Sequence, residues 1–227
     1  MTGIQAVLTG DLVDSTRSDR ARIEHTMELL SQGLPAGIRW EGWVNHLRFT
    51  RFRGDGWQIL VESPEDALRW SIVALAALKA DEKALETRIA IGIGTVGYVG
   101  DDNLNDASGP AFSASGRALD AMHKYERLFL MGSETSSRAT DKDCLVSGAE
   151  KAAVILIDER LSRWTPEQAE AIAHFLHPTS PSATEIAQRL AITPQAVSYR
   201  LKGAGAKPLR EAIEALESDW AEKWVGQ

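Results

Sequence analysis

The stretch "AVLTGDLVDSTRSD", residues 6–19, places two acids where an apolar segment gives way to a helix-like one. The run Ala6, Val7 and Leu8 is typical of a buried strand, so we predict a strand over residues 3–10 and a helix over 16–33. Asp11 and Asp14 then lie at the end of the strand. Two carboxylates at the end of a core strand raise the question of whether the chain binds a nucleotide.

Working outward, the next segments alternate between strands and helices. "HLRFTRFRGDGWQILVES", residues 46–63, has two extended arms around Gly54-Asp55-Gly56, and Asp-Gly favours a tight hairpin turn. Periodicity then predicts a helix, a strand, a helix and a strand over 64–83, 87–99, 109–125 and 127–132. The order β-α-β-β-α-β is the ferredoxin-like arrangement. We therefore predict an α+β fold, a ferredoxin-like sheet with helices on one face.

The two carboxylates Asp11 and Asp55 are expected to converge, because the first strand and the hairpin are neighbours in such a sheet. A pair of hard oxygen ligands suits Mg²⁺ bound together with substrate phosphates. Backbone N–H groups from Val13 to Thr16 would add donors for a triphosphate. Each acid also has a plain structural explanation: Asp14 or Ser15 caps the helix, and Asp55 serves only the turn.

Composition is that of an ordinary globular protein. The 227 residues are 44% hydrophobic and 25% charged. No apolar run approaches the ~20 residues that span a bilayer, and the N-terminus lacks the basic segment of a signal peptide. Cys144 is the only cysteine, and the five histidines show no ligand spacing, which argues against disulfides and zinc. We expect a cytoplasmic protein without a membrane partner.

Charge is uneven along the chain. The net charge is −7, yet residues 186–210 contain no Asp or Glu and carry Arg189, Arg200, Lys202, Lys207 and Arg210. Such a segment predicts a local anionic partner, and an ordinary solvated helix face explains it equally well.

Five blocks, "GDLVDST", "RFRGDGWQI", "PEDALRW", "TRIAIGIGTVG" and "SGPAFSASGRALD", follow the order and rough spacing of class III nucleotidyl cyclase catalytic domains. The resemblance covers residues 4–132, and the chain is also similar to the SatD-like small bacterial proteins. It implies that Asp11 and Asp55 bind Mg²⁺ or Mn²⁺, with the Leu12 carbonyl as a further ligand. It also implies base recognition by Arg51 and Asp106, and contacts to ribose and triphosphate from Ser113 and Arg117.

Departures from the cyclase pattern weaken the expected chemistry more than the expected binding. Ser113 stands where the family has an asparagine and is too short to copy its contact. Asp14 replaces the usual glycine beside the phosphates, so it either recruits the metal more strongly or repels the triphosphate. Arg51 replaces a lysine and keeps a donor for a base. Because cyclase catalysis is mostly positioning and charge neutralisation, we expect nucleotide and metal binding rather than turnover.

The C-terminal part predicts a helix-turn-helix over about residues 182–203, in a helical region of 146–227 that follows a cyclase-like domain of 1–145. Ser182 and Glu185 form a capping box, and Thr193 with Pro194 begins the second helix. The outward residues of that helix are Gln195, Ser198, Tyr199 and Lys202, which suit base edges or phosphates of duplex DNA, with Arg200 on the backbone. The same shape also serves as a dimer contact or a plain structural pair.

Two functions compete. The first is a DNA-binding regulator whose cyclase-like domain binds a nucleotide or nucleotide-derived ligand, with Asp11 and Asp55 facing Arg117 of a second subunit in a homodimer. The second is an active nucleotidyl cyclase, or a related nucleotidyltransferase, that uses the catalytic set Asp11, Asp55 and Arg117 and is regulated by its helix-turn-helix. A structural interaction module is a third reading, and it leaves the aspartate pair unexplained.

Overall fold

The computed structural model describes residues 3–32, 34, 38, 48–52, 54–99, 103–133 and 145–225. Within them lies a five-stranded sheet in the order β2-β3-β1-β4-β5. Its strands are β1 (Ile4–Leu12), β2 (Arg48–Phe52), β3 (Gly56–Val61), β4 (Thr87–Thr95) and β5 (Leu128–Gly132). β1 is antiparallel to both β3 and β4, whereas β4 and β5 are parallel.

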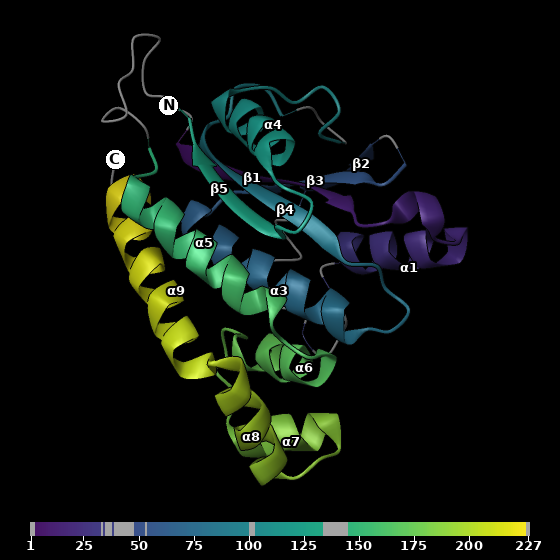
Figure 1. Ribbon diagram of the computed structural model, residues 1–227. Helices are drawn as coiled ribbons and strands as arrows, with labels where there is room; N and C mark the ends of the chain where they lie inside the picture. The colour runs from purple at the N-terminus through teal and green to yellow at the C-terminus, as the bar shows by residue number, and fades with distance from the viewer. Residues whose placement is uncertain are drawn as a thin grey trace.

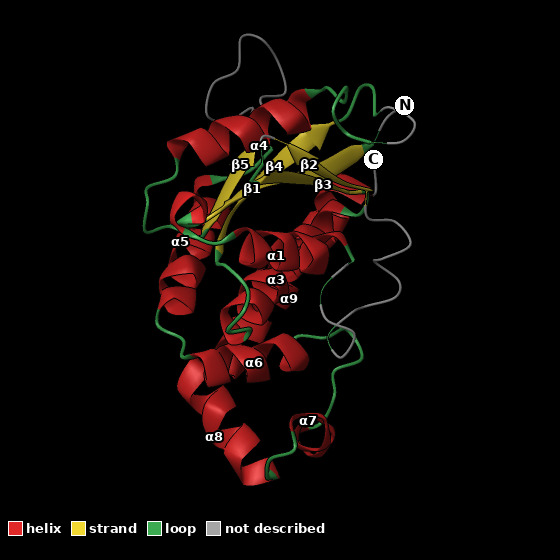
Figure 2. Cartoon of the chain, turned by 90° about the vertical axis from the view of Figure 1, so that its right-hand side faces the viewer, coloured by secondary structure: helices red, strands yellow, loops and turns green. Residues whose placement is uncertain are grey.

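The chain order confirms the α+β class. It begins with the expected β-α-β-β-α-β succession, which a further helix and the strand β5 extend. α1 (Arg20–Ser31) links β1 to β2, and η2 (Pro64–Asp66) with α3 (Ala67–Ala80) links β3 to β4. α4 (Pro110–Ala121) then crosses from β4 to β5. Figures 1 and 2 show α4 on one side of the sheet and α1 and α3 on the other.

The prediction that helices cover one face of the sheet is therefore wrong. Successive strand residues point to opposite faces, and β1 is apolar on both: Leu8 packs in the core that contains α3, while Val7 packs with Phe112 of α4. Because both faces of the sheet are apolar, helices must pack on both of them. Gly92 allows α4 to come close, because a Cβ there would lie 2.3 Å from the backbone nitrogen of Ser115.

The start of the first helix also differs from the prediction. A short 3₁₀ turn, η1 (Ser15–Arg17), follows Asp14, whose φ of 55° is left-handed, and Ser18 is extended. The α-helix begins only at Arg20, where the Asp19 carboxylate accepts a hydrogen bond from the Arg22 amide at 2.8 Å. Asp19 is thus the N-cap, and Asp14 makes no side-chain cap.

The helical region continues the same core. It comprises α5 (Gly148–Ser162), α6 (Pro166–Phe175), α7 (Ala183–Leu190), α8 (Pro194–Ala204), α9 (Ala206–Trp220) and a π-helical turn, η4 (Ala221–Val225). α6 packs on α3, and α9 runs back beside α5 (Figure 1). The Trp220 indole donates to Glu150 at the start of α5 at 2.7 Å.

One hydrophobic cluster joins both parts of the chain: it contains Leu8 and Ile91 of the sheet together with Ile172 of α6 and Ile213 of α9. The structure does not show a separate helix-turn-helix domain, although the contact between α7 and α8 has a small hydrophobic cluster of its own. The division into residues 1–145 and 146–227 stays a prediction. None of the helices in the described ranges is long and apolar enough to span a membrane.

Candidate functional site

Asp11 lies near the end of β1, opposite Gly56 of β3 and Arg88 of β4. The Arg88 guanidinium makes a two-pronged contact with its carboxylate: Nε donates to Oδ1 at 2.8 Å, and Nη2 donates to Oδ2. This hydrogen bond to Asp11, which outweighs burial, raises the pKa of Arg88. Both side chains are half-buried, at 30% and 22% exposure, so Asp11 is held in a charge-neutral pair.

Asp55 comes close to the same end of β1 through the hairpin turn. Its carbonyl accepts a hydrogen bond from the Leu12 amide at 3.2 Å, and its carboxylate accepts one from the Ser15 hydroxyl. The turn and the segment after β1 are therefore tied together. The two aspartates share one corner of the sheet, but each has its own partner.

The backbone after β1 is less open than expected. The Val13 amide donates to the Glu86 carbonyl at 2.8 Å, so it is already used. Ser15 and Thr16 belong to the 3₁₀ turn rather than to an α-helix. The expected α-helical N-terminus at residues 13–16 is therefore absent, because the left-handed Asp14 and the extended Ser18 interrupt the helix.

Arg51 closes the hairpin. Its Nε donates to the Gly54 carbonyl at 2.6 Å, and its Nη1 donates to Glu24 of α1 at 2.8 Å. The guanidinium thus holds the turn against α1 and leaves less of its donor set for a base.

The remaining residues implied by the cyclase resemblance lie elsewhere on the surface. Ser113 and Arg117 are exposed on the outer side of α4, one turn apart, while Ala111, Ala114 and Ala118 face the sheet. Asp106 is exposed in the segment before α4. Among the described contacts, none joins these three residues to Asp11 or Asp55 within one chain.

The donor atoms at this corner of the sheet suit a divalent cation, but the positive charge of Arg88 opposes its binding. Carboxylate, hydroxyl and carbonyl oxygens are ligands that Mg²⁺ prefers, yet Arg88 occupies both oxygens of Asp11. The described residues contain no group of three or more His, Cys, Asp or Glu side chains arranged to hold a metal ion. A cation would have to compete with Arg88.

Sequence reasoning missed Arg88 and a buried polar chain beside it. The Thr9 and Ser115 hydroxyls are 2.7 Å apart, and Gln58 donates to Thr9 at 3.1 Å. Thr9 lies two residues before Asp11, so both point toward the α4 face. The polar residues at the alternate positions 9 and 11, directly after the apolar run of residues 6–8, were the available signal.

The α7–α8 pair forms as predicted. Ser182 and Glu185 make the capping box, and Ala191 ends α7 with a left-handed φ of 53°. Thr193 caps α8 by accepting from the Ala196 amide at 3.1 Å. Val197 packs against Ile186 and Ala187, all at most 3% exposed.

The side of α8 opposite these contacts is exposed to solvent. Gln195, Ser198 and Lys202 are exposed there, and Tyr199 is 80% exposed. Figures 1 and 2 place α7 and α8 at the end of the molecule farthest from the sheet.

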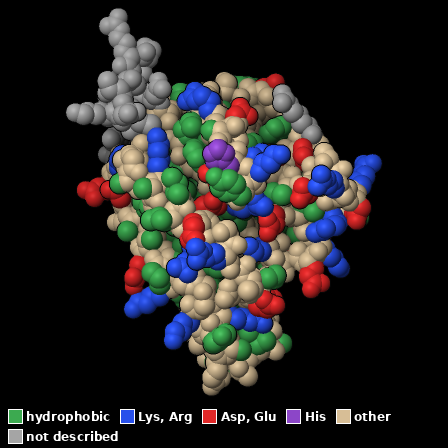
Figure 3. Space-filling view, in the orientation of Figure 1, with side chains coloured by type: hydrophobic (Ala, Val, Ile, Leu, Met, Phe, Trp, Pro, Cys, Tyr) green, Lys and Arg blue, Asp and Glu red, His purple; other side chains and the backbone are tan. Residues whose placement is uncertain are grey.

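Two basic residues of the acid-free segment face inward instead. Arg200 donates to Glu170 of α6 at 2.7 Å, and Arg210 lies 3.5 Å from the Phe175 ring centroid. Arg200 is thus already paired with a carboxylate of α6 that the local sequence does not reveal, and its contact with a DNA backbone stays a prediction. On the face in Figure 3, basic and acidic side chains are interspersed.

Comparison with solved structures returns nucleotidyl cyclases. The chain is similar to the guanylyl cyclase Cya2, with TM-score 0.41, 18% identity, and coverage of 58% of this chain and 77% of that one. It is also similar to the catalytic core of a rhodopsin-guanylyl cyclase with converted specificity in complex with ATPαS, with TM-score 0.43, 14% identity, and coverage of 57% and 78%. A bacterial light-regulated adenylyl cyclase gives TM-score 0.42 and 16% identity, over 57% of this chain and 43% of that one.

At this identity and TM-score the likeness transfers neither a function nor a site residue. No known family profile matches the chain. No curated protein matches it either.

Proposed function

We propose that this chain is a DNA-binding regulator that uses α8 as its recognition helix. The observation that carries the proposal is the orientation of α8: Val197 is buried against α7, so Gln195, Tyr199 and Lys202 project together into solvent. An exposed helix with this polar face, held by a preceding helix through a tight turn, is the arrangement that enters a major groove.

Within this proposal the exposed residues have separate roles. Gln195 and Tyr199 suit base edges, whereas Lys202 suits a phosphate. Arg200 is a positioning residue, because its ion pair with Glu170 holds α8 against α6.

The test is a fluorescence titration of the whole chain with a labelled random-sequence duplex over a range of salt concentrations. Lys202→Ala should weaken binding to every duplex and reduce the salt slope by about one. Lys83→Ala, which removes an exposed lysine from the loop after α3, is the matched control and should bind like the wild type. A wild type without measurable affinity at low salt would remove the proposal.

Sequence preference is tested separately by selection from a random duplex pool. Gln195→Ala and Tyr199→Ala should change the selected sequences, while Gln188→Ala on the exposed side of α7 should not. If both recognition-helix variants select the wild-type sequences, α8 is not the reading element.

A second candidate function is the binding of a nucleotide, with Mg²⁺ or Mn²⁺, at the end of β1. It is favoured by the closeness of Asp11, Asp55 and Ser15 at one corner of the sheet. A bound divalent cation would supply charge neutralisation for phosphates. Asp11 and Asp55 would hold it, and Arg88 would have to leave Asp11.

Equilibrium dialysis with Mn²⁺ and each nucleoside triphosphate tests the binding, and mass spectrometry of the same mixtures tests turnover. Asp11→Asn should abolish metal-dependent binding, while Asp120→Asn on the outer side of α4 should leave it unchanged. If Asp11→Asn retains metal-dependent nucleotide binding, the end of β1 is not the binding site. A cyclic product would favour the alternative function, an active nucleotidyl cyclase.

Turnover would need Arg117, which α4 directs away from Asp11 in one chain. A homodimer that brings Arg117 of a second subunit to this corner stays a prediction. Light scattering with and without nucleotide and Mn²⁺, on the wild type and Arg117→Ala, tests it. A protein that stays monomeric in every condition contradicts it.

A further inference from the structure

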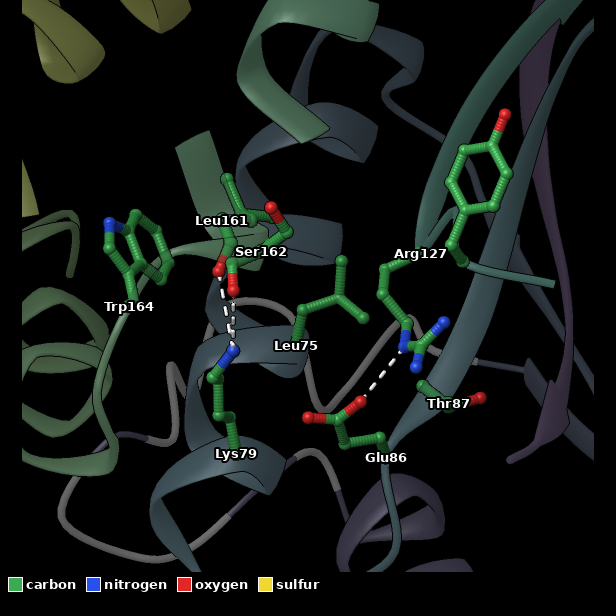
Figure 4. Close-up of a pocket in the computed structure, with 9 residues that line it drawn as sticks. Leu75, Lys79, Glu86, Thr87, Arg127, Leu161, Ser162 and Trp164 are labelled. Atoms are coloured by element: carbon green, nitrogen blue, oxygen red, sulfur yellow. Dashed lines mark hydrogen bonds and ion pairs between the residues drawn. The ribbon is translucent and has the colours of Figure 1, made fainter. Parts of the chain in front are cut away.

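A pocket of about 130 Å³ lies between α3, the end of α5 and the strand β4 (Figure 4). Leu75, Leu161 and Trp164 contribute its apolar wall, and Lys79, Glu86 and Arg127 contribute its charges. Its lining includes no residue of α8 and neither Asp11 nor Asp55, so its occupancy can be tested separately from the functions proposed above.

Size limits what the apolar part can hold. An engineered apolar cavity of about 150 Å³ binds benzene, so a pocket of about 130 Å³ that opens to solvent suits one six-membered ring. In Figure 4 Leu75 lies in the middle, with Lys79 and Trp164 on one side and Glu86 and Arg127 on the other. A planar ring would therefore contact aliphatic and indole surfaces.

The net charge of the pocket residues determines which polar group of a ligand the pocket favours. Arg127 Nε and Glu86 Oε2 are 2.9 Å apart, so these two charges cancel. Lys79 Nζ is 3.4 Å from each of the Leu161 and Ser162 carbonyls, which is long for a hydrogen bond to a cation, and no described carboxylate forms an ion pair with it. One half-buried positive charge is left over in the pocket.

The charged residues around the pocket make Lys79 the most favourable position for an anion. An adjoining cavity of about 400 Å³ shares Lys79, Glu86 and Arg127 with the pocket. Its remaining charged residues are mainly acidic: Asp14, Asp81 and Glu82 against Arg22. An anion is therefore favoured at Lys79 and disfavoured farther out.

We propose that this pocket binds a small carboxylate that carries a single planar apolar ring. The ring lies between Leu75, Leu161 and Trp164, and the carboxylate accepts hydrogen bonds from the Lys79 ammonium in place of the two long carbonyl contacts.

The probes are three compounds with nearly the same ring: benzoate, neutral benzamide and cationic benzylamine. Each is titrated into the whole chain and followed by amide chemical shifts and calorimetry. Benzoate should bind, with the largest shifts at Ser162, Trp164 and Arg127, and benzamide should bind about ten- to a hundredfold more weakly, as expected for loss of a charged hydrogen bond. Absence of a saturable benzoate shift, or preference for benzylamine, would overturn the proposal.

Lys79→Met should weaken benzoate by a similar factor and leave benzamide unchanged, whereas Lys79→Arg should retain benzoate binding. Lys83→Met is the matched control, since Lys83 is exposed four residues later and does not line the pocket. Circular dichroism confirms that the variants fold. Trp164 is unsuitable for substitution because its indole also donates to the Ala204 carbonyl at 3.0 Å. If Lys79→Met weakens all three probes equally, the lysine does not recognise the carboxylate.

Discussion

Asp11 accepts hydrogen bonds from Arg88, a residue 77 positions later in the chain. A carboxylate that is satisfied by a guanidinium has little reason to bind a cation, because the pair is already neutral. The same acid becomes a strong oxygen ligand when the guanidinium is removed. We therefore expect Arg88 to oppose metal binding at this corner of the sheet.

Arg88→Met should increase Mn²⁺ affinity about fivefold, which corresponds to about 1 kcal/mol for a half-buried pair. Electron paramagnetic resonance of bound Mn²⁺ measures the change. Arg127→Met, which breaks the neighbouring pair with Glu86, is the control and should leave Mn²⁺ binding at Asp11 unaltered. An Arg88→Met protein with unchanged Mn²⁺ affinity would show that Asp11 is structural only.

Asp66 lies at the start of α3 with its carboxylate partly withdrawn from water. Burial, followed by the nearby charges of Glu65 and Glu217, raises its pKa from 3.8 to about 6. The folded state therefore holds a proton on Asp66 that the unfolded state loses near pH 4.

The free energy of unfolding should accordingly fall as the pH rises from about 4 to about 6, through the contribution of Asp66. Asp66→Asn should remove this dependence and stabilise the protein by about 1–2 kcal/mol at pH 7, a figure reduced for partial solvation. Urea unfolding at pH 4.5 and 7 tests it, with exposed Asp120→Asn as the control. Equal stability of Asp66→Asn and wild type at pH 7 would contradict the assignment.

At the scale of elements, Arg69 joins α3 to α9. Its Nε donates to Glu217 at 2.6 Å, and Nη1 donates to the Leu176 carbonyl at 3.3 Å, just past α6. Burial opposes the charge of Arg69, but the hydrogen-bonded Glu217 outweighs it and raises the pKa of Arg69. With side chains only 12% and 19% exposed, the pair fixes α9 against the helix that underlies the sheet.

Arg69→Met should destabilise the protein by about 3 kcal/mol, because it leaves Glu217 charged and largely buried without a partner. The double variant Arg69→Met, Glu217→Met should recover most of this loss. Arg163→Met is the control: its partner Glu159 is one turn earlier on the surface of α5, and the cost should stay within about 0.5 kcal/mol. Chemical denaturation measures all three, and a double variant no better than the single one would contradict the argument.

At the scale of the whole molecule, the sheet and the C-terminal helices share their apolar residues. Ile91 of β4 and Ile213 of α9 are both fully buried in one cluster. Neither part can keep its buried surface when the other unfolds, which favours a single cooperative transition.

Native-state hydrogen exchange should therefore give the amides of β1 and α9 the same free energy of opening, equal to that from urea denaturation. The amides of α7, whose hydrophobic contacts lie in the smaller cluster, serve as the comparison and should open at or below that value. An α9 that opens well below β1 would instead support two independently stable domains.

The sequence by itself determined the features that depend on neighbouring residues. Capping at Ser182 and Thr193, the Asp55 turn and the succession of strands and helices all follow from local backbone chemistry within a few residues. Those signals were enough to predict the α+β class and the form of the α7–α8 pair.

The tertiary structure decided which side chains meet. Arg88 with Asp11, Arg200 with Glu170, and the packing of α4 on the second face of the sheet join residues far apart in the chain. Periodicity reports that a strand residue faces one side or the other, but not what covers that side. The charge state of the Asp11 corner and the direction of Arg200 depend on those distant partners, so only the folded chain reveals them.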